Sequence, residues 1–312
     1  MSEWREEFSR FYSPWQVVDD TAELPEGQGT SVARQSVEGQ GALAPSEEEW
    51  EAEERAGARI RRDVELAGKL ALEVAGQSAR SPSLPSPLFR IWVNEPCLVT
   101  TRREARLPRF EAAAQAARAR GWPVFVRDSG GTTIPHLRES LHLSLLLPRI
   151  QGDEPGTDRV YTFLCEPVRE ALALLGVEAG YGVVPNSFCD GRFNLVAQGR
   201  KVAGTSQRWK GGIPGHPVGK GFILAHMTLF VGGDMAHATG QVNRFLREAG
   251  GEGDFDPHAV VTVRELEALP VGVTGDPEAR VTGDPTGSDA GPPMAGPVMA
   301  RVRNALRRVL AD

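Results

Sequence analysis

Short apolar runs alternate with amphipathic segments through the middle of the chain, and this alternation limits the fold more than any other feature. Runs with the length and composition of strands occupy residues 88–93, 97–101, 123–127, 141–148, 192–197, 200–207 and 221–231. Gln198-Gly199 separates two of these runs and indicates a hairpin. Because both hairpin and crossover connections are required, the sequence predicts a mixed sheet with helices packed against it.

Helical patterns fill the gaps between these runs. Ser46 and Glu49 form a capping signal, and apolar residues then repeat at helical spacing up to the proline-rich breaker at 78–87. Further helices are expected at residues 108–120, 168–177, 235–250 and 262–269.

The two ends of the chain differ from this central part. Residues 1–45 are acidic and are expected to be a disordered leader, although Trp4, Phe8, Phe11 and Trp15 also have the spacing of a short amphipathic helix. A single domain is expected over 46–270. The Gly, Pro and Asp-rich stretch at 271–295, with VTGDP twice, predicts a linker, and 296–312 predicts a basic amphipathic helix.

Composition removes several classes of function. The 312 residues carry a net charge of −6 and contain no apolar run of about 18 residues, so neither a membrane span nor a secretory signal is expected. No dense basic patch with interleaved aromatic residues suggests nucleic-acid binding. The three cysteines show no metal-ligand spacing, and no metal site is expected. They favour free thiols in a reducing cytoplasm.

The first segment that could carry chemistry is VRDSGGTTIPH, residues 126–136. Adjacent glycines after a strand let a ligand approach the backbone, and their amides can face its oxygens. The Lys-Ser/Thr of a nucleotide-binding Walker loop is absent. A plain turn is the alternative.

The second segment is NSFCDGRFNLVAQGRKVAGTSQRW, residues 186–209. Cys189 is flanked by polar, turn-forming residues, which is compatible with a reactive thiol or with a structural one. Lys201 is one of four lysines among 35 basic residues. Its compact charge could polarise a carbonyl or stabilise a thiolate, or it could be an ordinary surface charge.

Three motifs together resemble the lipoate ligase and octanoyltransferase family, which shares its catalytic fold with biotin protein ligases. They are RIWVNEPCLVTTRREARLP (90–108), VRDSGGTTIPHLRESLHLSL (126–145) and SFCDGRFNLVAQGRKVAGTSQR (187–208). The likeness is strongest to the branch that moves octanoyl groups between lipoyl domains, from the glycine cleavage H protein to the lipoyl domains of the 2-oxoacid dehydrogenases. It covers roughly residues 55–270.

The resemblance implies an α+β fold with a mixed, largely antiparallel sheet flanked by helices. It makes Cys189 the nucleophile of the transferase branch and Lys201 the lysine common to the wider family. The expected substrate-binding residues are Arg127, Ser129, Gly130, Gly131, His136, Gly204, Thr205 and Ser206. Backbone amides of the Gly130–Gly131 loop, or of a turn at Gly204–Ser206, would stabilise the oxyanion.

The activity implied is transfer of an octanoyl or lipoyl group through a Cys189 thioester to a lysine of a lipoyl domain. The donor would be the glycine cleavage H protein or an acyl carrier protein, and no cofactor would be required. Two alternatives remain open. One is a ligase that uses ATP and Mg to activate free lipoate or octanoate, and the other is a non-catalytic relative that binds acyl carriers. His136 and AHMTLFV (225–231) resemble features of the ATP-dependent ligases and of the other transferase branches.

Spacing adds a condition to this interpretation. A hairpin that turns at Gln198-Gly199 places Lys201 opposite about Val196, and an extended chain would leave Cys189 roughly 23 Å away at about 3.3 Å per residue. Residues 186–192 must therefore fold back, and Asp190-Gly191 is the expected place for the turn.

Overall fold

The computed structural model describes residues 2–12, 15–21, 46–76, 86–149, 155–211, 221–268 and 296–311. The helices are α1 (Glu3–Phe11), α2 (Glu47–Gly76), α3 (Phe110–Ala119), α4 (Thr157–Ala173), α5 (Met235–Ala249), α6 (Val263–Glu267) and α7 (Gly296–Ala311). Two 3-10 turns, η2 (Glu104–Arg106) and η3 (Pro257–Ala259), lie between them. The predicted linker at 271–295 and the breaker at 78–85 lie outside the described residues.

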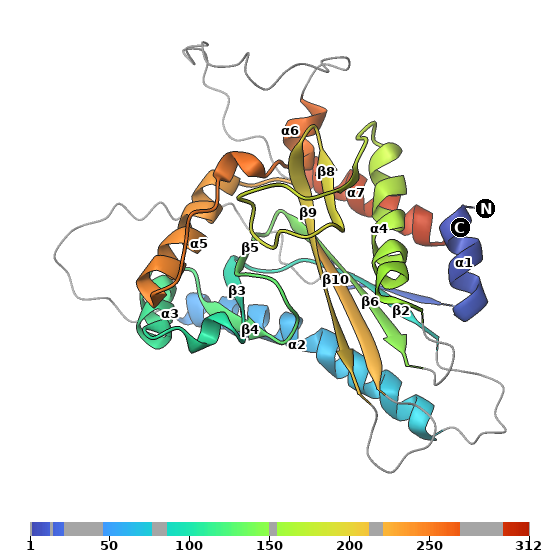
Figure 1. Cartoon of the computed structure of the whole chain (residues 1–312), viewed down its shortest axis with the longest axis horizontal. Coiled ribbons are helices and arrows are strands. Elements are labelled where there is room, and N and C mark those ends of the chain that lie inside the picture. The colour runs from blue at the N-terminus through green and yellow to red at the C-terminus, as the bar shows by residue number, and fades with distance from the viewer. Residues whose placement is uncertain are drawn as a thin grey trace.

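The strands form two sheets (Figure 1). They are β1 (Gln16–Asp19), β2 (Leu88–Trp92), β3 (Cys97–Thr101), β4 (Val124–Arg127), β5 (Ile134–His136), β6 (Ser140–Pro148), β7 (Gly180–Gly182), β8 (Asn194–Ala197), β9 (Arg200–Lys210) and β10 (Phe222–Phe230). The large sheet has the order β1-β2-β6-β10-β9-β8-β7, and the small sheet has the order β4-β3-β5. Only the β1–β2 and β3–β4 pairs among these are parallel. The predicted mixed, largely antiparallel α+β fold is therefore confirmed.

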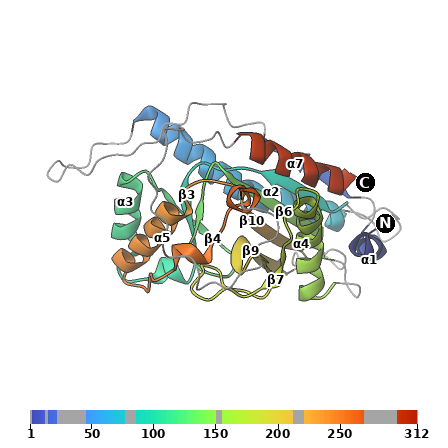
Figure 2. The same cartoon turned by 90° about the horizontal axis from the view of Figure 1, so that it is seen from above.

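The two faces of the large sheet have different partners because residues of β6 alternate along the strand. Leu141, Leu143 and Leu145 point into a core that they share with α1, α4 and α7. Ser140, His142 and Ser144 point to the opposite face. Figures 1 and 2 show α1, α4 and α7 gathered at one end of the molecule, with α3 and α5 at the other.

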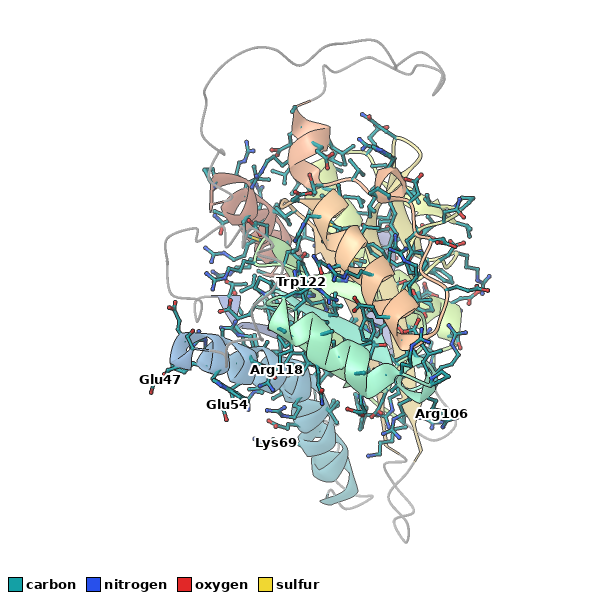
Figure 3. All side chains as sticks on the ribbon, turned by 90° about the vertical axis from the view of Figure 1, so that its left-hand side faces the viewer. Glu47, Glu54, Lys69, Arg106, Arg118 and Trp122 are labelled. Carbon is teal, nitrogen blue, oxygen red and sulfur yellow. The ribbon has the colours of Figure 1, made fainter. Side chains whose placement is uncertain are left out.

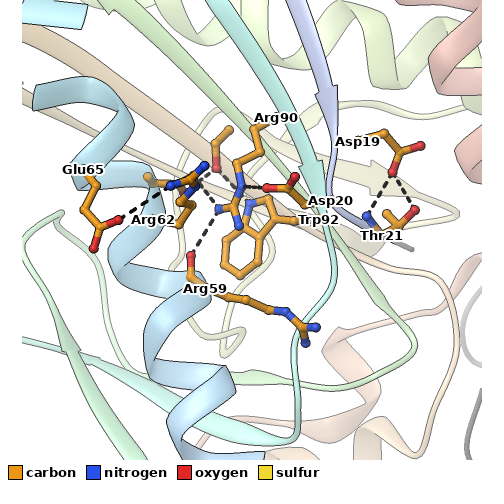
Figure 4. Close-up of polar contacts among 10 residues, drawn as sticks. Asp19, Asp20, Thr21, Arg59, Arg62, Glu65, Arg90 and Trp92 are labelled. Carbon is orange, nitrogen blue, oxygen red and sulfur yellow. Dashed lines mark hydrogen bonds and ion pairs between the residues drawn. The ribbon is translucent and has the colours of Figure 1, made fainter. Parts of the chain in front are cut away.

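Helix α2 runs along the second face and is tied to it by a buried ion pair (Figure 4). The Arg90 guanidinium donates to the Asp63 carboxylate at 2.8 Å and to the carbonyl oxygen of Arg59 at 3.1 Å. Its Nε donates to Asp20, just after β1. Near the N-terminal end of α2, Arg118 of α3 pairs with Glu53 and lies over the ring of Trp50. Figure 3 shows Arg118 on α3, next to α2. These contacts hold α2 against the large sheet and α3.

The expectation of a disordered leader over 1–45 is wrong for its first part. Helix α1 is docked, with Trp4 and Phe8 buried, and β1 adds a parallel strand to the edge of the large sheet. The Phe8 ring lies 4.9 Å from that of Phe163 and 5.7 Å from that of Phe89. The aromatic spacing was thus the better guide, because burying large rings outweighs the acidic composition. Residues 22–45 lie outside the described part of the chain.

The predicted C-terminal helix is present as α7, and the start of the chain closes its last turn. Trp15 Nε1 donates to the carbonyl oxygen of Leu310 at 3.0 Å, and Arg5 donates to that of Val309. Helix ends leave such carbonyls without intrahelical partners. Segments from both ends of the chain therefore pack as one unit on α4.

A Trp15→Phe substitution tests this closure. It removes the indole N–H but keeps an aromatic ring, so we expect a loss of about 1 kcal/mol in the free energy of unfolding. This corresponds to a fall of about 2 °C in Tm. Trp50→Phe is the matched control, because Trp50 is 48% exposed and phenylalanine keeps an aromatic ring under Arg118, so Tm should change little. Equal melting temperatures for all three proteins would show that the Trp15 bond does not hold α7.

The bounds of helix α4 also differ from the prediction. The sequence predicted a helix over 168–177, beginning just after Pro167, but α4 begins at Thr157 and contains this proline. Phe163, Leu164 and Val168 on both sides of Pro167 are buried in one core. Their burial maintains the helix through a residue that lacks an N–H donor.

Candidate active site

The β8–β9 hairpin sets the position of Lys201. Gln198 and Gly199 have φ values of 49° and 72°, as in a two-residue turn with both central residues left-handed. Lys201 pairs with Val196 across the hairpin, as the spacing predicted. Its side chain has no solvent exposure.

The segment before β8 folds back toward Lys201, as the sequence required. The left-handed residues are Asn186, with φ 61°, and Cys189, with φ 51°, so the turn does not lie at Asp190-Gly191 as expected. The Lys201 ammonium donates to the carbonyl oxygen of Phe188 and to that of Cys189, the latter at 2.9 Å. Lys201 therefore contacts the main chain that carries the cysteine.

The Cys189 sulfur faces a different set of donors. Arg127 Nη2 and the backbone N–H of Thr132 each lie 3.2 Å from Sγ. Burial raises the pKa of the Cys189 thiol, but Arg127, Lys201 and the hydrogen bonds from Thr132 outweigh it, so that the pKa lies below its ordinary value. A thiol with this pKa supplies more thiolate at neutral pH than an ordinary cysteine.

Burial and the neighbouring acidic groups shift the pKa of Lys201 in opposite directions. Removal from water lowers its pKa to about 8, although Cys189 and Asp190 favour its charged form. The side chain has room because residue 204 is glycine: a Cβ there would lie 3.0 Å from both Cε and Nζ of Lys201. The end of the Lys201 side chain thus packs directly against Gly204.

The loop at residues 129–132 closes over the cysteine. Gly131 has a φ of 103°, and a Cβ on it would lie 2.6 Å from Cys189 Sγ. Two residues of the large sheet hold this loop: Ser206 Oγ donates to the Gly130 carbonyl oxygen at 3.0 Å, and His226 Nε2 lies 2.9 Å from Ser129 Oγ. Its glycines therefore serve close packing against the sulfur.

A narrow pocket opens beside the sulfur, with about 280 Å³ of empty space that includes open solvent. Its apolar wall consists of Ile134, Phe188 and Phe230. Its polar side is formed by Arg127, Cys189, Lys201, Ser206, His226 and Thr228. The Cys189 sulfur thus lies at the side of a partly apolar slot. Among the described residues, no group of His, Cys, Asp or Glu side chains is arranged to hold a metal ion.

Residues 66–267 match the family described as the lipoyl protein ligase A/B catalytic domain. The chain belongs to this family. A Kyrpidia tusciae protein named octanoyl-[GcvH]:protein N-octanoyltransferase is 45% identical over 168 residues, which are 53% of this chain and 57% of that protein. The chain therefore spans little more than half the length of this curated relative. An uncharacterised protein of Cupriavidus necator is 32% identical over 226 residues, or 70% of this chain and 82% of that protein.

The fold is also that of a solved family member. The crystal structure of lipoate-protein ligase A bound with ATP has a TM-score of 0.50 with this chain at 15% identity. The likeness covers 80% of this chain and 79% of the ligase chain. Within the described parts of the chain, no helix is both long and apolar enough to cross a bilayer.

Most of the residues predicted for the lipoyl protein ligase site lie together. Those that line the pocket are Arg127, Cys189, Lys201, Gly204, Thr205 and Ser206. Ser129, Gly130 and Gly131 lie on the loop that covers the sulfur. Gly204–Ser206 is not a turn, however, because it lies inside β9, and the Thr205 N–H already donates to Asn194 Oδ1.

His136 lies behind the pocket and does not line it. Strand β5 pairs it with Cys97, its Nδ1 meets Asn94 Nδ2 at 3.1 Å, and its ring lies 4.1 Å from that of His142. Burial lowers the pKa of His136 well below its ordinary value. The structure therefore does not place His136 with the other predicted residues at the pocket, and substrate binding by His136 stays a prediction.

Sequence reasoning missed two polar contributors. Thr132 follows the glycines and reaches the sulfur through its backbone N–H, which no side-chain pattern reveals. His226 was noticed only within AHMTLFV. On a strand, His226, Thr228 and Phe230 share one face, and this period of two could have placed all three in the pocket.

Proposed function

We propose that this chain transfers an octanoyl or lipoyl group between carrier proteins through a thioester on Cys189. The observation that carries the proposal is the position of Cys189 Sγ, which lies at the pocket and within 3.2 Å of both a guanidinium and a backbone N–H. A buried structural thiol needs neither donor. The relative from Kyrpidia tusciae is named for the same type of transfer.

The chemistry consists of two acyl exchanges. The Cys189 thiolate attacks the acyl carbonyl on the donor, forming a carbon–sulfur bond. The bond to the donor's lysine nitrogen, or to a carrier thiol, then breaks, and the leaving group takes up a proton. A lysine amine of the acceptor next attacks the thioester, loses a proton and releases the thiolate. Exchange between similar acyl linkages is near thermoneutral, so this sequence needs no ATP.

The apolar side of the pocket suits the first carbons of an acyl chain, and the pocket must widen to take the rest, because its cavity volume is only about 20 Å³. Its apolar wall of Ile134, Phe188 and Phe230 would cover the methylene groups while the carbonyl faces Cys189. Full burial of eight carbons contributes up to about 6 kcal/mol, at about 0.8 kcal/mol per group. This value is the upper limit of what the acyl chain can contribute to affinity.

Donor and acceptor are proposed from the same relative. Its name points to the glycine cleavage H protein as octanoyl donor and to a nitrogen of a second protein as acceptor, for which we propose the lysine of a lipoyl domain. Acyl carrier protein is the second donor to test.

An ATP-dependent ligase remains the runner-up, since a member of the family binds ATP. A ligase must hold the phosphate of an acyl-adenylate. The donors at the glycine loop that suit a phosphate are Arg127 and the Thr132 N–H, and both point at Cys189 Sγ. An adenylate would compete with the thiolate for them. This arrangement favours the transferase.

Intact-mass spectrometry decides between the three functions. We expect a mass gain of one octanoyl group when the chain is mixed with octanoylated H protein or octanoyl-acyl carrier protein, without ATP. An unmodified lipoyl domain added next should take up that group. Modification that requires free octanoate and ATP would establish the ligase instead. Absence of an adduct with any donor would leave the non-catalytic carrier-binding function.

A further inference from the structure

We propose that Arg127 is the cation that serves the Cys189 thiolate and that Lys201 is a positioning residue, which holds the cysteine's backbone in its left-handed conformation. The inference rests on the proposed function only in taking Cys189 as the nucleophile. It reverses the sequence-based expectation, in which Lys201 stabilises the thiolate and Arg127 binds substrate.

The contacts of Arg127 fit a built-in counter-ion. Nη2 lies 3.2 Å from Cys189 Sγ and also donates to the carbonyl oxygens of Gly130 and Thr132, at 3.0 and 2.9 Å. Nη1 donates to the carbonyl oxygen of Val99 at 3.0 Å. Since the guanidinium is planar, bonds on both nitrogens fix its orientation toward the sulfur.

The contacts of Lys201 point to another task. Its hydrogen bonds go to the carbonyl oxygens of Phe188 and Cys189, and among the described residues no hydrogen bond joins Nζ to the sulfur. The ammonium also lies 5.5 Å from the centre of the Phe188 ring. Lys201 adds positive potential at Cys189, but its direct partners are two consecutive peptide groups.

The conformation of Cys189 explains why those peptide groups need support. A residue with a Cβ avoids a φ of 51° unless its surroundings impose it. Three bonds do so here: Thr132 Oγ1 accepts from the Cys189 N–H at 2.8 Å, while Asn194 Nδ2 and Lys201 Nζ donate to the Cys189 carbonyl oxygen at 2.8 and 2.9 Å. Loss of the lysine would release the Phe188 carbonyl as well. The loop would then relax and turn the sulfur away from Arg127 and the Thr132 N–H.

The two roles predict separable effects. Loss of charge at Arg127 should change the acidity of the thiol more than any other single substitution around it. Loss of charge at Lys201 should change mainly the orientation of the sulfur. Alkylation of Cys189 by iodoacetamide reports thiolate formation without any acyl donor. Cys97 and Cys165 serve as internal references, because burial raises the pKa of both thiols.

The experiment measures the rate of Cys189 alkylation against pH by peptide mass spectrometry in the full chain. In Arg127→Gln we expect the pH midpoint to rise by about one unit or more, which means about tenfold less thiolate at pH 7. Arg127→Lys should restore part of this shift. In Lys201→Gln, which keeps an N–H donor without charge, we expect a smaller rise of about half a unit, or about threefold. Lys201→Arg should retain the wild-type midpoint.

The outcome depends on which substitution, Arg127→Gln or Lys201→Gln, raises the pH midpoint of alkylation more. A larger rise in Lys201→Gln than in Arg127→Gln, reversed in Lys201→Arg, would overturn the proposal and make Lys201 the counter-ion. If Arg127→Gln fails to fold, a rise of more than one pH unit in the alkylation midpoint of Lys201→Gln would by itself overturn the proposal. These results do not depend on octanoyl transfer. A missing octanoyl adduct together with the predicted alkylation order would refute the transferase and keep the division of roles.

Discussion

Cys189→Ala is expected to lower kcat/KM for octanoyl transfer by at least about 10³-fold, because the variant has no group to hold the acyl chain between donor and acceptor. The methyl group of alanine fits the space of the thiol, and the surrounding hydrogen bonds of Lys201 to the main chain persist. The variant should therefore stay folded and still bind the donor. Transfer is measured as octanoyl on the acceptor domain, and the intermediate as octanoyl on the enzyme.

Cys165→Ala is the matched control. Cys165 is even more deeply buried than Cys189, at 0% against 8% exposed, but it lies on α4 with its sulfur directed at the carbonyl oxygen of Phe193 at 3.7 Å. This variant should lose a little stability and keep both the acyl adduct and the transfer rate. Transfer by Cys189→Ala at a near wild-type rate would refute the thioester mechanism, since donor and acceptor would then react directly.

The parts of this site that the sequence predicted are those set by local geometry. The Gln198-Gly199 turn fixes the register of the hairpin, and the position of Lys201 opposite Val196 follows from it. The length of chain between Cys189 and Val196, which lies opposite Lys201, was enough to require that the Cys189 loop folds back. Its turn was placed at Asp190-Gly191 because those residue types favour turns, whereas tertiary bonds from Lys201 and Thr132 impose the left-handed conformation on Cys189 itself. Propensity was overridden by contacts that no local pattern contains.

The parts that were missed depend on which strands become neighbours. His136 and His226 both follow apolar or glycine-containing segments, so their sequence surroundings do not show which of them lines the pocket. The order of the strands in the two sheets decides this. Strand β5 joins the small sheet and carries His136 behind the pocket, while β10 lies between β6 and β9 and carries His226 into it. Likewise, the sequence assigned α1 to an acidic leader, and only the packing of its aromatic residues against α4 shows that it is a docked helix.

Cross-strand register also explains why the active site lies on one face of the large sheet. Two rows run across β9, β10, β6 and β2 on this face. They contain Gly204, Thr228, His142 and Trp92 in one row, and Ser206, His226, Ser144 and Arg90 in the other. Burial lowers the pKa of both His142 and His226 to about 3, so these rings are neutral at pH 7. His226 in the pocket lining and His142 next to Thr228 therefore provide hydrogen bonds without a positive charge. Arg127 and Lys201 remain the cations near the Cys189 sulfur.

Gly131→Ala is expected to lower transfer by about 100-fold, because the loop and the sulfur would no longer fit together. A Cβ at this position would lie 2.6 Å from Cys189 Sγ and 3.0 Å from Arg127 Nη2, and a φ of 103° is strained for alanine. Either the loop or the cysteine must move, and both movements separate Sγ from the Thr132 N–H. Cys189 alkylation should slow in parallel, while the melting temperature shows that the fold is retained.

Gly130→Ala is the control because it changes the same loop by the same methyl group. No heavy atom lies within 4 Å of a Cβ at position 130, and its carbonyl oxygen keeps its bonds to Arg127 and Ser206. We expect transfer within about twofold of wild type. Equal activity of the two variants would mean that the loop does not pack on the sulfur during turnover, and the thiolate would then need stabilisation from elsewhere. A loss confined to Gly131→Ala ties the rate to the contact between this one backbone position and Cys189.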